Sequence, residues 1–176
     1  SYLMEINRFY PHKILAWSDK IKELLNGKFP FPIMMHVYPS NFCPLKCEFC
    51  IMESEKQEHK SILSLEILEK LIKECEENDL KCMHFSGGGE PLTNNNLINI
   101  FKKSQNFKFK IAMSTNGLLL KSEIADIVLD NIDYLRISLN SASRESFRKV
   151  CKVDKFDDIV GNIAKYIEKN IKPSNL

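Results

Sequence analysis

Three cysteines that lie close together are the residues best suited to metal chemistry. Cys43, Cys47 and Cys50 fall within eight residues in the pattern C-x3-C-x2-C. This spacing lets three thiolates reach one centre without any long-range closure of the chain. A reducing compartment and the strain of bridging such close neighbours both disfavour disulfides. Because thiolates bind zinc and iron–sulfur clusters, the pattern predicts a metal centre.

Spacing alone leaves the kind of metal centre open. A structural zinc site takes four protein ligands, and His36 and His59 lie near enough in the sequence to supply the fourth. An electron-transfer iron–sulfur cluster also normally has four cysteines. We interpret the remaining cysteines as small core residues: Cys75 lies on the face of a predicted helix, Cys82 in a predicted strand and Cys151 near the end of a predicted helix.

A set of three cysteines would leave one iron of a four-iron cluster open to a small molecule. An open position is what separates a catalytic metal site from a structural one. The cysteines lie in a polar stretch, residues 39–63, and loops of this length in compact domains are usually functional. The sequence therefore favours a catalytic centre in this loop.

Glycine-rich and polar segments follow three predicted strands. Residues 86–91 read Ser-Gly-Gly-Gly-Glu-Pro, residues 114–117 read Ser-Thr-Asn-Gly, and residues 138–140 read Ser-Leu-Asn. Glycines let backbone approach a ligand closely. Ser138 and Asn140 alternate with an apolar residue, so we expect both to point to the interior.

Predicted strands and helices alternate around these segments. Short apolar runs bounded by turn residues predict strands over residues 33–38, 80–85, 107–114 and 134–139. Apolar residues spaced by three or four predict helices over residues 65–77, 94–104, 122–129, 144–150 and 156–169. Ser64 is the expected cap of the first of these helices.

The alternation predicts an α/β fold with a parallel sheet and right-handed crossovers. Residues 1–32 are expected to form a helical leader with one short helix, in which Ile14, Trp17, Ile21 and Leu24 share a face. Residues 33–176 form the main domain. The cysteine loop follows the first strand, which places the site at the C-terminal ends of the strands.

With these motifs, the sequence resembles the radical SAM superfamily. The resemblance rests on the cysteine loop, with Phe49 just before its third cysteine, and on Gly88-Gly89-Glu90-Pro91 after the second strand. The segments at 114–117 and 138–140 also look like that family, and the match spans about residues 33–170. The fold that the resemblance implies is a partial (βα)6 TIM-like barrel.

The resemblance implies two cofactors, a [4Fe–4S] cluster and S-adenosylmethionine. Carried over, Cys43, Cys47 and Cys50 would hold the cluster, and S-adenosylmethionine would chelate its fourth iron. One electron would then cleave S-adenosylmethionine to methionine and a 5′-deoxyadenosyl radical, which takes a hydrogen atom from the substrate. The protein supplies orientation and a dry cavity.

The same resemblance implies further residues that bind the cofactor. Backbone groups of Gly87, Gly88 and Gly89, together with Glu90, would accept hydrogen bonds from the ammonium group of the methionine moiety. Ser138 and Asn140 would bind the ribose or the carboxylate. Cofactor binding is less strongly implied for Ser114 and Asn116, because Thr-Asn-Gly is a common turn. Phe49 would shield the cluster.

The chain has room for four βα units, whereas the family barrel has six. We therefore expect the first four units of that barrel. A missing C-terminal part or a second chain would cover the edge of the fourth strand, and the fragment alone could be inactive. We interpret His84 as a core histidine, and nothing supports Cys151 as a hydrogen donor beyond its presence.

Composition and charge limit the kinds of partner that the protein can bind. The 176 residues carry a net charge of +2, too little for the basic field that gathers nucleic acid. No apolar run approaches a membrane helix, and the first residues lack a signal peptide, so we expect a cytoplasmic protein. The expected partners are a reductant of the flavodoxin or ferredoxin type and an unknown substrate, for which we favour a peptide or natural product.

Overall fold

The computed structural model describes residues 16–52 and 60–170, which fall into two compact units, residues 1–32 and 33–176. In the first unit, α1 spans Ser18–Leu25 and ends at Asn26, and Gly27 follows with φ +73°. The helix predicted there extends to Ile14, which lies outside the described residues. Leu24 and Leu25 are exposed within this unit.

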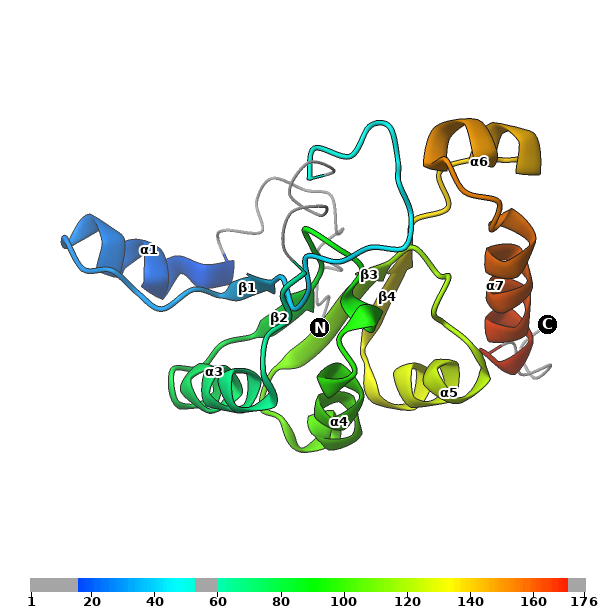
Figure 1. Cartoon of the computed structure of the whole chain (residues 1–176). Coiled ribbons are helices and arrows are strands. Elements are labelled where there is room, and N and C mark those ends of the chain that lie inside the picture. Colours follow the sequence, from blue (N-terminus) through cyan, green and yellow to red (C-terminus); the bar gives the residue numbers. More distant parts are fainter. Residues whose placement is uncertain (1–15, 53–59, 171–176) are drawn as a thin grey trace, which may run out of the picture. The chain divides into compact units, whose positions relative to one another are not determined.

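The second unit contains a four-stranded parallel sheet in the order β1-β2-β3-β4. The strands are β1 (Met34–Val37), β2 (Cys82–Phe85), β3 (Lys110–Thr115) and β4 (Tyr134–Ile137). Each strand pairs with the next one along the chain, with helices between them (Figure 1). This arrangement confirms the predicted α/β fold and the parallel sheet of a partial barrel.

Three helices pack on one side of this sheet (Figure 1): α3 (Leu65–Glu77), α4 (Asn96–Lys103) and α5 (Ser122–Asn131). The predicted cap of α3 is confirmed, because Ser64 Oγ accepts a hydrogen bond from Ile67 N at 3.2 Å. Two short 3-10 turns, η2 (Pro91–Thr93) and η3 (Ser104–Asn106), flank α4. The helices α6 (Arg144–Cys151) and α7 (Phe156–Asn170) follow β4.

Alternation along β1 and β2 separates a packed face from a more exposed one, whereas β3 is buried on both faces from Ile111 to Thr115. Met83, Phe85 and Met113 are fully buried, and the ring of Phe85 meets that of Phe101 on α4 edge to face at 5.6 Å. Burying such side chains contributes about 1.5–3 kcal/mol each. The core of the second unit therefore lies between the sheet and helices α3 to α5.

The opposite side, which we call the open face, carries the intervening side chains of the four strands. His36, His84 and Ala112 occupy neighbouring register positions on β1, β2 and β3. Ser114 and Arg136 form the next such pair, on β3 and β4. Most of these side chains are polar, so this face is suited to contact a polar molecule rather than a helix.

The strands are shorter than predicted because pairing ends where the neighbour ends. The predicted third strand begins at residue 107, but the ladder begins at Lys110, whose partner Cys82 is the first residue of β2. Phe107 instead stacks on Phe109, with the ring centroids 5.4 Å apart. None of the helices in the described ranges is long and apolar enough to cross a membrane.

The residue that ends α6 is strained. Lys152 has φ +57°, a conformation that costs an L-residue about 1–2 kcal/mol and glycine almost nothing. We expect Lys152→Gly to be more stable than Lys152→Ala by about 1 kcal/mol, although both lose the ion pair between Lys152 and Glu48. At Lys149, inside the same helix, the order should reverse, because alanine is favoured over glycine there by about 1 kcal/mol. Urea unfolding of the four variants measures both differences. Equal stabilities of the two Lys152 variants would show that the backbone is unstrained.

Candidate functional site

The C-terminal ends of the strands surround a cavity of about 230 Å³. Every predicted site residue lines it: Cys43, Cys47, Phe49, Cys50, Gly87, Gly88, Gly89, Glu90, Ser114, Asn116, Ser138 and Asn140. Five lining residues were not among the predicted site residues: Leu45, Ser86, Pro91, Thr115 and Arg136. Larger hollows lie at the other end of β3 and beside α7, and their linings contain no cysteine. The chemistry-bearing residues therefore converge on this one cavity.

The two ends of the cysteine loop are anchored beside β2. The backbone N–H of Glu90 donates to the carbonyl of Phe42 at 2.7 Å. The side-chain amide of Asn94 donates to the carbonyls of Pro39 and Leu63, both at 2.9 Å. One asparagine thus binds both ends of the loop, and Asn94 is fully buried. This contact explains how the described ends of the polar loop are held beside the strands.

Gly89 allows this close approach. A Cβ at Gly89 would lie 2.3 Å from the carbonyl oxygen of Phe42 and 2.6 Å from the carbonyl carbon of Asn41. Both of these atoms belong to the backbone and cannot move away alone. At Gly88 the nearest atom would be the flexible methyl group of Met52, at 3.2 Å. The glycine run is therefore required at Gly89 by packing and is less constrained at Gly88.

The end of α6 supports the middle of the cysteine loop. Lys46 N donates to Cys151 O at 3.1 Å and Glu48 N donates to Val150 O at 2.9 Å. The last carbonyls of a helix have no partner within the helix, and here the loop supplies the donors. Lys152 adds an ion pair with Glu48 at 3.2 Å.

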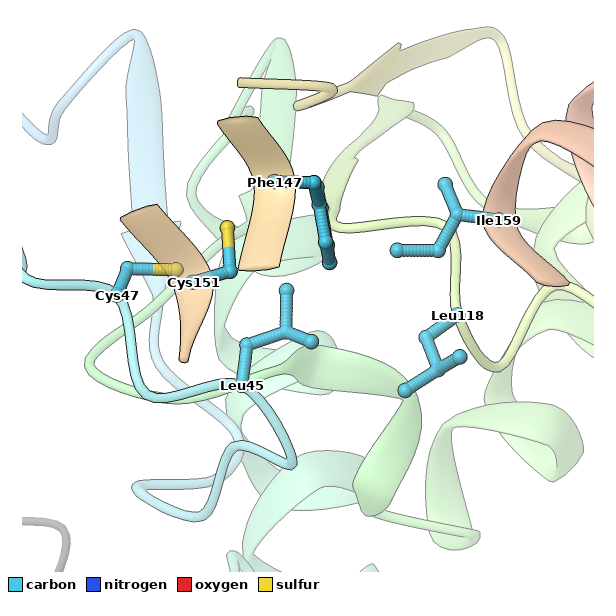
Figure 2. Packing of buried hydrophobic residues seen from close by; sticks show 6 residues of the cluster. All are labelled: Leu45, Cys47, Leu118, Phe147, Cys151 and Ile159. Carbon is cyan, nitrogen blue, oxygen red and sulfur yellow. The ribbon is translucent and has the colours of Figure 1, made fainter. Parts of the chain in front are cut away.

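An apolar cluster fixes the same part of the loop. Figure 2 shows Leu45 and Cys47 facing Phe147 and Cys151, with the sulfurs of Cys47 and Cys151 turned toward each other. These four residues are buried, and Leu118 and Ile159 complete the cluster. The other two cysteines of the motif are partly buried against it. Cys151 is thus a core residue, as interpreted from the sequence, but its neighbour is a cysteine of the motif.

Glu90 joins the glycine loop to the end of β3. Its Oε1 accepts from Thr115 Oγ1 at 2.6 Å and from Leu92 N at 3.3 Å, and its Oε2 accepts from Asn116 N at 2.8 Å. The side chain is only 2% exposed. Burial raises the pKa of this carboxyl group, and the three hydrogen bonds offset part of that shift. Glu90 therefore fixes the shape of the cavity wall as well as lining it.

The side-chain contacts of Asn116 define its position more closely than its turn motif predicted. Its Nδ2 lies 3.6 Å from Cys43 Sγ, and its Oδ1 accepts from Leu118 N at 2.9 Å. Gly117 follows with φ +81°, so the turn itself is real. The same residue thus completes a turn and presents an amide donor to one of the three cysteines.

The remaining predicted residues line the cavity with fewer contacts. Ser138 N donates to Thr115 O at 2.8 Å, which carries the β3–β4 pairing one residue further. Asn140 is exposed at the cavity rim. Phe49 is 59% exposed, so its ring borders the cavity and is not enclosed by it. Its shielding role stays a prediction.

The residues present fit an iron–sulfur cluster better than a single metal ion. Among the described residues, no three His, Cys, Asp or Glu side chains are grouped closely enough to hold one ion. The three thiols instead line a shared cavity, as is suitable for a cluster in which each cysteine binds its own iron. Of the two histidines considered for zinc, His36 packs on His84 with ring centroids 4.7 Å apart, and His59 lies outside the described residues.

Two other residues interpreted as core differ in outcome. Cys75 is fully buried, with its sulfur 4.0 Å from that of Met35. His84 is only half-buried and lies on the open face, where its Nε2 is 2.9 Å from Ser114 Oγ. The alternation of β2 places His84 on the face opposite to that of the fully buried Met83 and Phe85. This periodicity was the sequence signal that could have placed His84 on the open face.

Comparison with protein families gives one match. The model of the radical SAM superfamily matches residues 37–176. A probable GTP 3′,8-cyclase of Saccharolobus islandicus is 32% identical over 138 residues, which cover 78% of this chain and 44% of that protein. A GTP 3′,8-cyclase of Desulforamulus reducens is 31% identical, covering 76% and 42%. The chain thus spans less than half the length of these relatives.

Solved structures share the fold. SuiB of Streptococcus suis bound to S-adenosylmethionine superposes with a TM-score of 0.72 at 21% identity, over 89% of this chain and 36% of that one. SuiB bound to its precursor peptide SuiA gives 0.70 at 20% identity, over 96% and 38%. BtrN in complex with AdoMet and 2-DOIA gives 0.56 at 18% identity, over 69% and 52%.

The contrast between neighbouring glycines can be tested directly. We expect Gly89→Ala to lower the free energy of unfolding by about 1–3 kcal/mol, because the new methyl group displaces backbone. Gly88→Ala should stay within about 0.5 kcal/mol of the wild type, since only a methionine methyl group must move. Urea unfolding measures both variants. Equal losses in the two would mean that the loop does not depend on the approach at Gly89.

Glu90 predicts a dependence of stability on pH. Because its pKa is raised in the folded protein, its contribution is complete below the ordinary pKa and is lost as pH rises through the raised value. We compare the wild type with Glu90→Gln, in which other titrating groups are retained and cancel. The unfolding free energy of the wild type minus that of the variant should decrease as pH rises from about 4 to 7. An increase over this range would contradict the assignment.

Proposed function

The chain belongs to the radical SAM superfamily, and on that basis we propose that Cys43, Cys47 and Cys50 hold a [4Fe–4S] cluster whose fourth iron binds S-adenosylmethionine. Members of this superfamily are enzymes that use these two cofactors. When bound, they supply reductive cleavage of S-adenosylmethionine and a radical that abstracts hydrogen. The observation that carries the proposal is the convergence of the three cysteines and the glycine segment on one cavity.

The protein's own residues position the reacting molecules. The anchored loop holds the three thiolates on one side of the cavity, and Asn116 directs an amide hydrogen toward Cys43, where it stabilises a sulfur ligand. Gly87, Gly88, Gly89 and Glu90 line the same cavity, and Glu90 N binds the backbone next to Cys43. The Oε2 of Glu90 accepts one described hydrogen bond, which leaves a lone pair for the ammonium group of the cofactor.

The ends of β3 and β4 would hold the rest of the cofactor. Ser114, Ser138 and Asn140 also line the cavity, and their hydroxyl and amide groups suit the ribose or the carboxylate. Phe49 borders the same space and would limit access of water to the cluster. These roles follow the sequence prediction, and the shared cavity supports them.

Partners and substrate follow from this chemistry. A reductant of the flavodoxin or ferredoxin type would supply the electron, and a second chain or a further part of the protein would cover the exposed edge of β4. All six cysteines lie in described residues and none forms a disulfide, which supports a reducing compartment such as the cytoplasm. The predicted peptide or natural product finds a parallel in the SuiB complex, whereas the cyclases are named for GTP.

The proposal predicts how the reduced protein responds to S-adenosylmethionine. After anaerobic reconstitution, the electron paramagnetic resonance signal should change when S-adenosylmethionine is added, because the fourth iron is open. Cys43→Ala and Cys50→Ala should lose the four-iron signal, whereas Cys82→Ala, on the open face, should keep it. Deoxyadenosine released after addition of dithionite is measured separately.

Two alternative functions have distinct outcomes in the same experiment. A four-iron signal that ignores S-adenosylmethionine would indicate an electron-transfer protein. Metal analysis that finds zinc and no iron would indicate a structural zinc site. Either result would overturn the proposed enzyme.

A further inference from the structure

We propose that the open face, next to the cavity, binds an anionic group of the substrate, a phosphate or a carboxylate, between Arg136 and the imidazoles of His36 and His84. This inference rests on the proposed function, because it assumes that the cavity holds the cofactor and that the substrate lies beside it. It assigns the substrate a chemical feature that the motifs do not encode.

The basic side chains share one face and adjacent rows. His36 and His84 are register partners on β1 and β2, with ring centroids 4.7 Å apart. Arg136 is the register partner of Ser114, and Ser114 Oγ lies 2.9 Å from His84 Nε2. The four side chains thus form a continuous polar strip from β1 to β4, in which the shared serine connects the histidine pair to the arginine.

Arg136 supplies the positive charge of the strip. The pKa of His84 is lowered, first by burial and then by the charges of His36 and Arg136, which favours a neutral imidazole that can hydrogen-bond beside the guanidinium. Within the described part of the chain, Arg136 forms no ion pair. Asp133, the nearest carboxylate along β4, precedes the strand and pairs with Lys110 at 2.6 Å. Glu90 lines the same cavity as Arg136, but its oxygens bind Leu92, Thr115 and Asn116, and no ion pair joins it to Arg136 among the described residues.

The position suits a substrate rather than a distant regulator. Arg136 and Ser114 line the cavity and also belong to the strip, so a molecule held there would touch the space assigned to the cofactor. Ala112, the register partner of His84 on β3, adds only a methyl group between β2 and β4. Tyr134, half exposed in the same row, offers an aromatic surface for the remainder of the substrate.

A guanidinium group binds phosphate and carboxylate by charge-assisted hydrogen bonds, and a neutral imidazole can donate one N–H bond to the same anion. Arginine is the stronger contributor because its planar fork binds two oxygens at once. Losing such a bond costs about 1.5–3 kcal/mol, or roughly a ten-fold or greater loss of affinity. Arg136 is therefore the residue whose removal should matter most.

The test measures anion binding with the cofactor already in place. Calorimetric titration of the reconstituted protein, saturated with S-adenosylmethionine, uses pyrophosphate and malonate as probes for phosphate and carboxylate. We expect one probe to bind, Arg136→Gln to weaken it at least ten-fold, and His84→Asn to weaken it to a smaller extent. Arg148→Gln is the matched control, because Arg148 is 64% exposed on α6, and its affinity should equal that of the wild type.

Three results would overturn the inference: neither probe binds, the two arginine variants bind alike, or Arg136→Gln weakens S-adenosylmethionine instead of the anion. In the last case Arg136 serves the carboxylate of the cofactor. Circular dichroism confirms that each variant is folded. Failure of the proposed function shows in the paramagnetic resonance experiment, which needs no anion, so the two failures are distinguishable.

Discussion

The site depends on backbone hydrogen bonds that hold the cysteine loop at separate points. A free loop of this length would spread its three thiolates over many positions, and ordering it costs about 1–2 kcal/mol for each residue fixed. The contact between Glu90 N and Phe42 O and the two bonds from Asn94 fix its ends. The last carbonyls of α6 fix its middle. On the side of the loop all of these bonds use backbone groups, which leaves the cysteines available for chemistry, whereas Asn94 contributes through its side chain.

Glu90 both lines the cavity and links two distant segments of the chain. Its carboxylate connects the glycine segment after β2 to the turn after β3, so the two walls of the cavity move together. Burial of this link disfavours the charged form of the carboxyl group, and three hydrogen-bond donors offset part of that cost. Two of the three donors are backbone N–H groups, so they do not depend on the side chains of Leu92 and Asn116.

Much of the fold and part of the site follow from the sequence. The cysteine spacing, the glycine run and the alternation of strands and helices are local signals that predicted the parallel sheet, and with the family resemblance they predicted twelve of the seventeen residues that line the cavity. The role of α6 and the strip on the open face depend on register and on contacts between distant segments. His84 was taken for a core residue because periodicity gives the two faces of a strand without saying which one is covered. Arg136 gave no local signal at all, since an arginine in a strand resembles any exposed cation.

The support that the end of α6 gives to the middle of the cysteine loop affects how the protein acquires its active form. The backbone donors of Lys46 and Glu48 bind carbonyls that lie roughly one hundred residues later in the chain, at Cys151 and Val150. Contacts of such sequence separation form late in folding. During synthesis, the three thiols emerge long before their support. Insertion of iron is therefore a step for the completed domain, and a ribosome-bound chain would expose a reactive cysteine loop to oxidation and to the wrong metal.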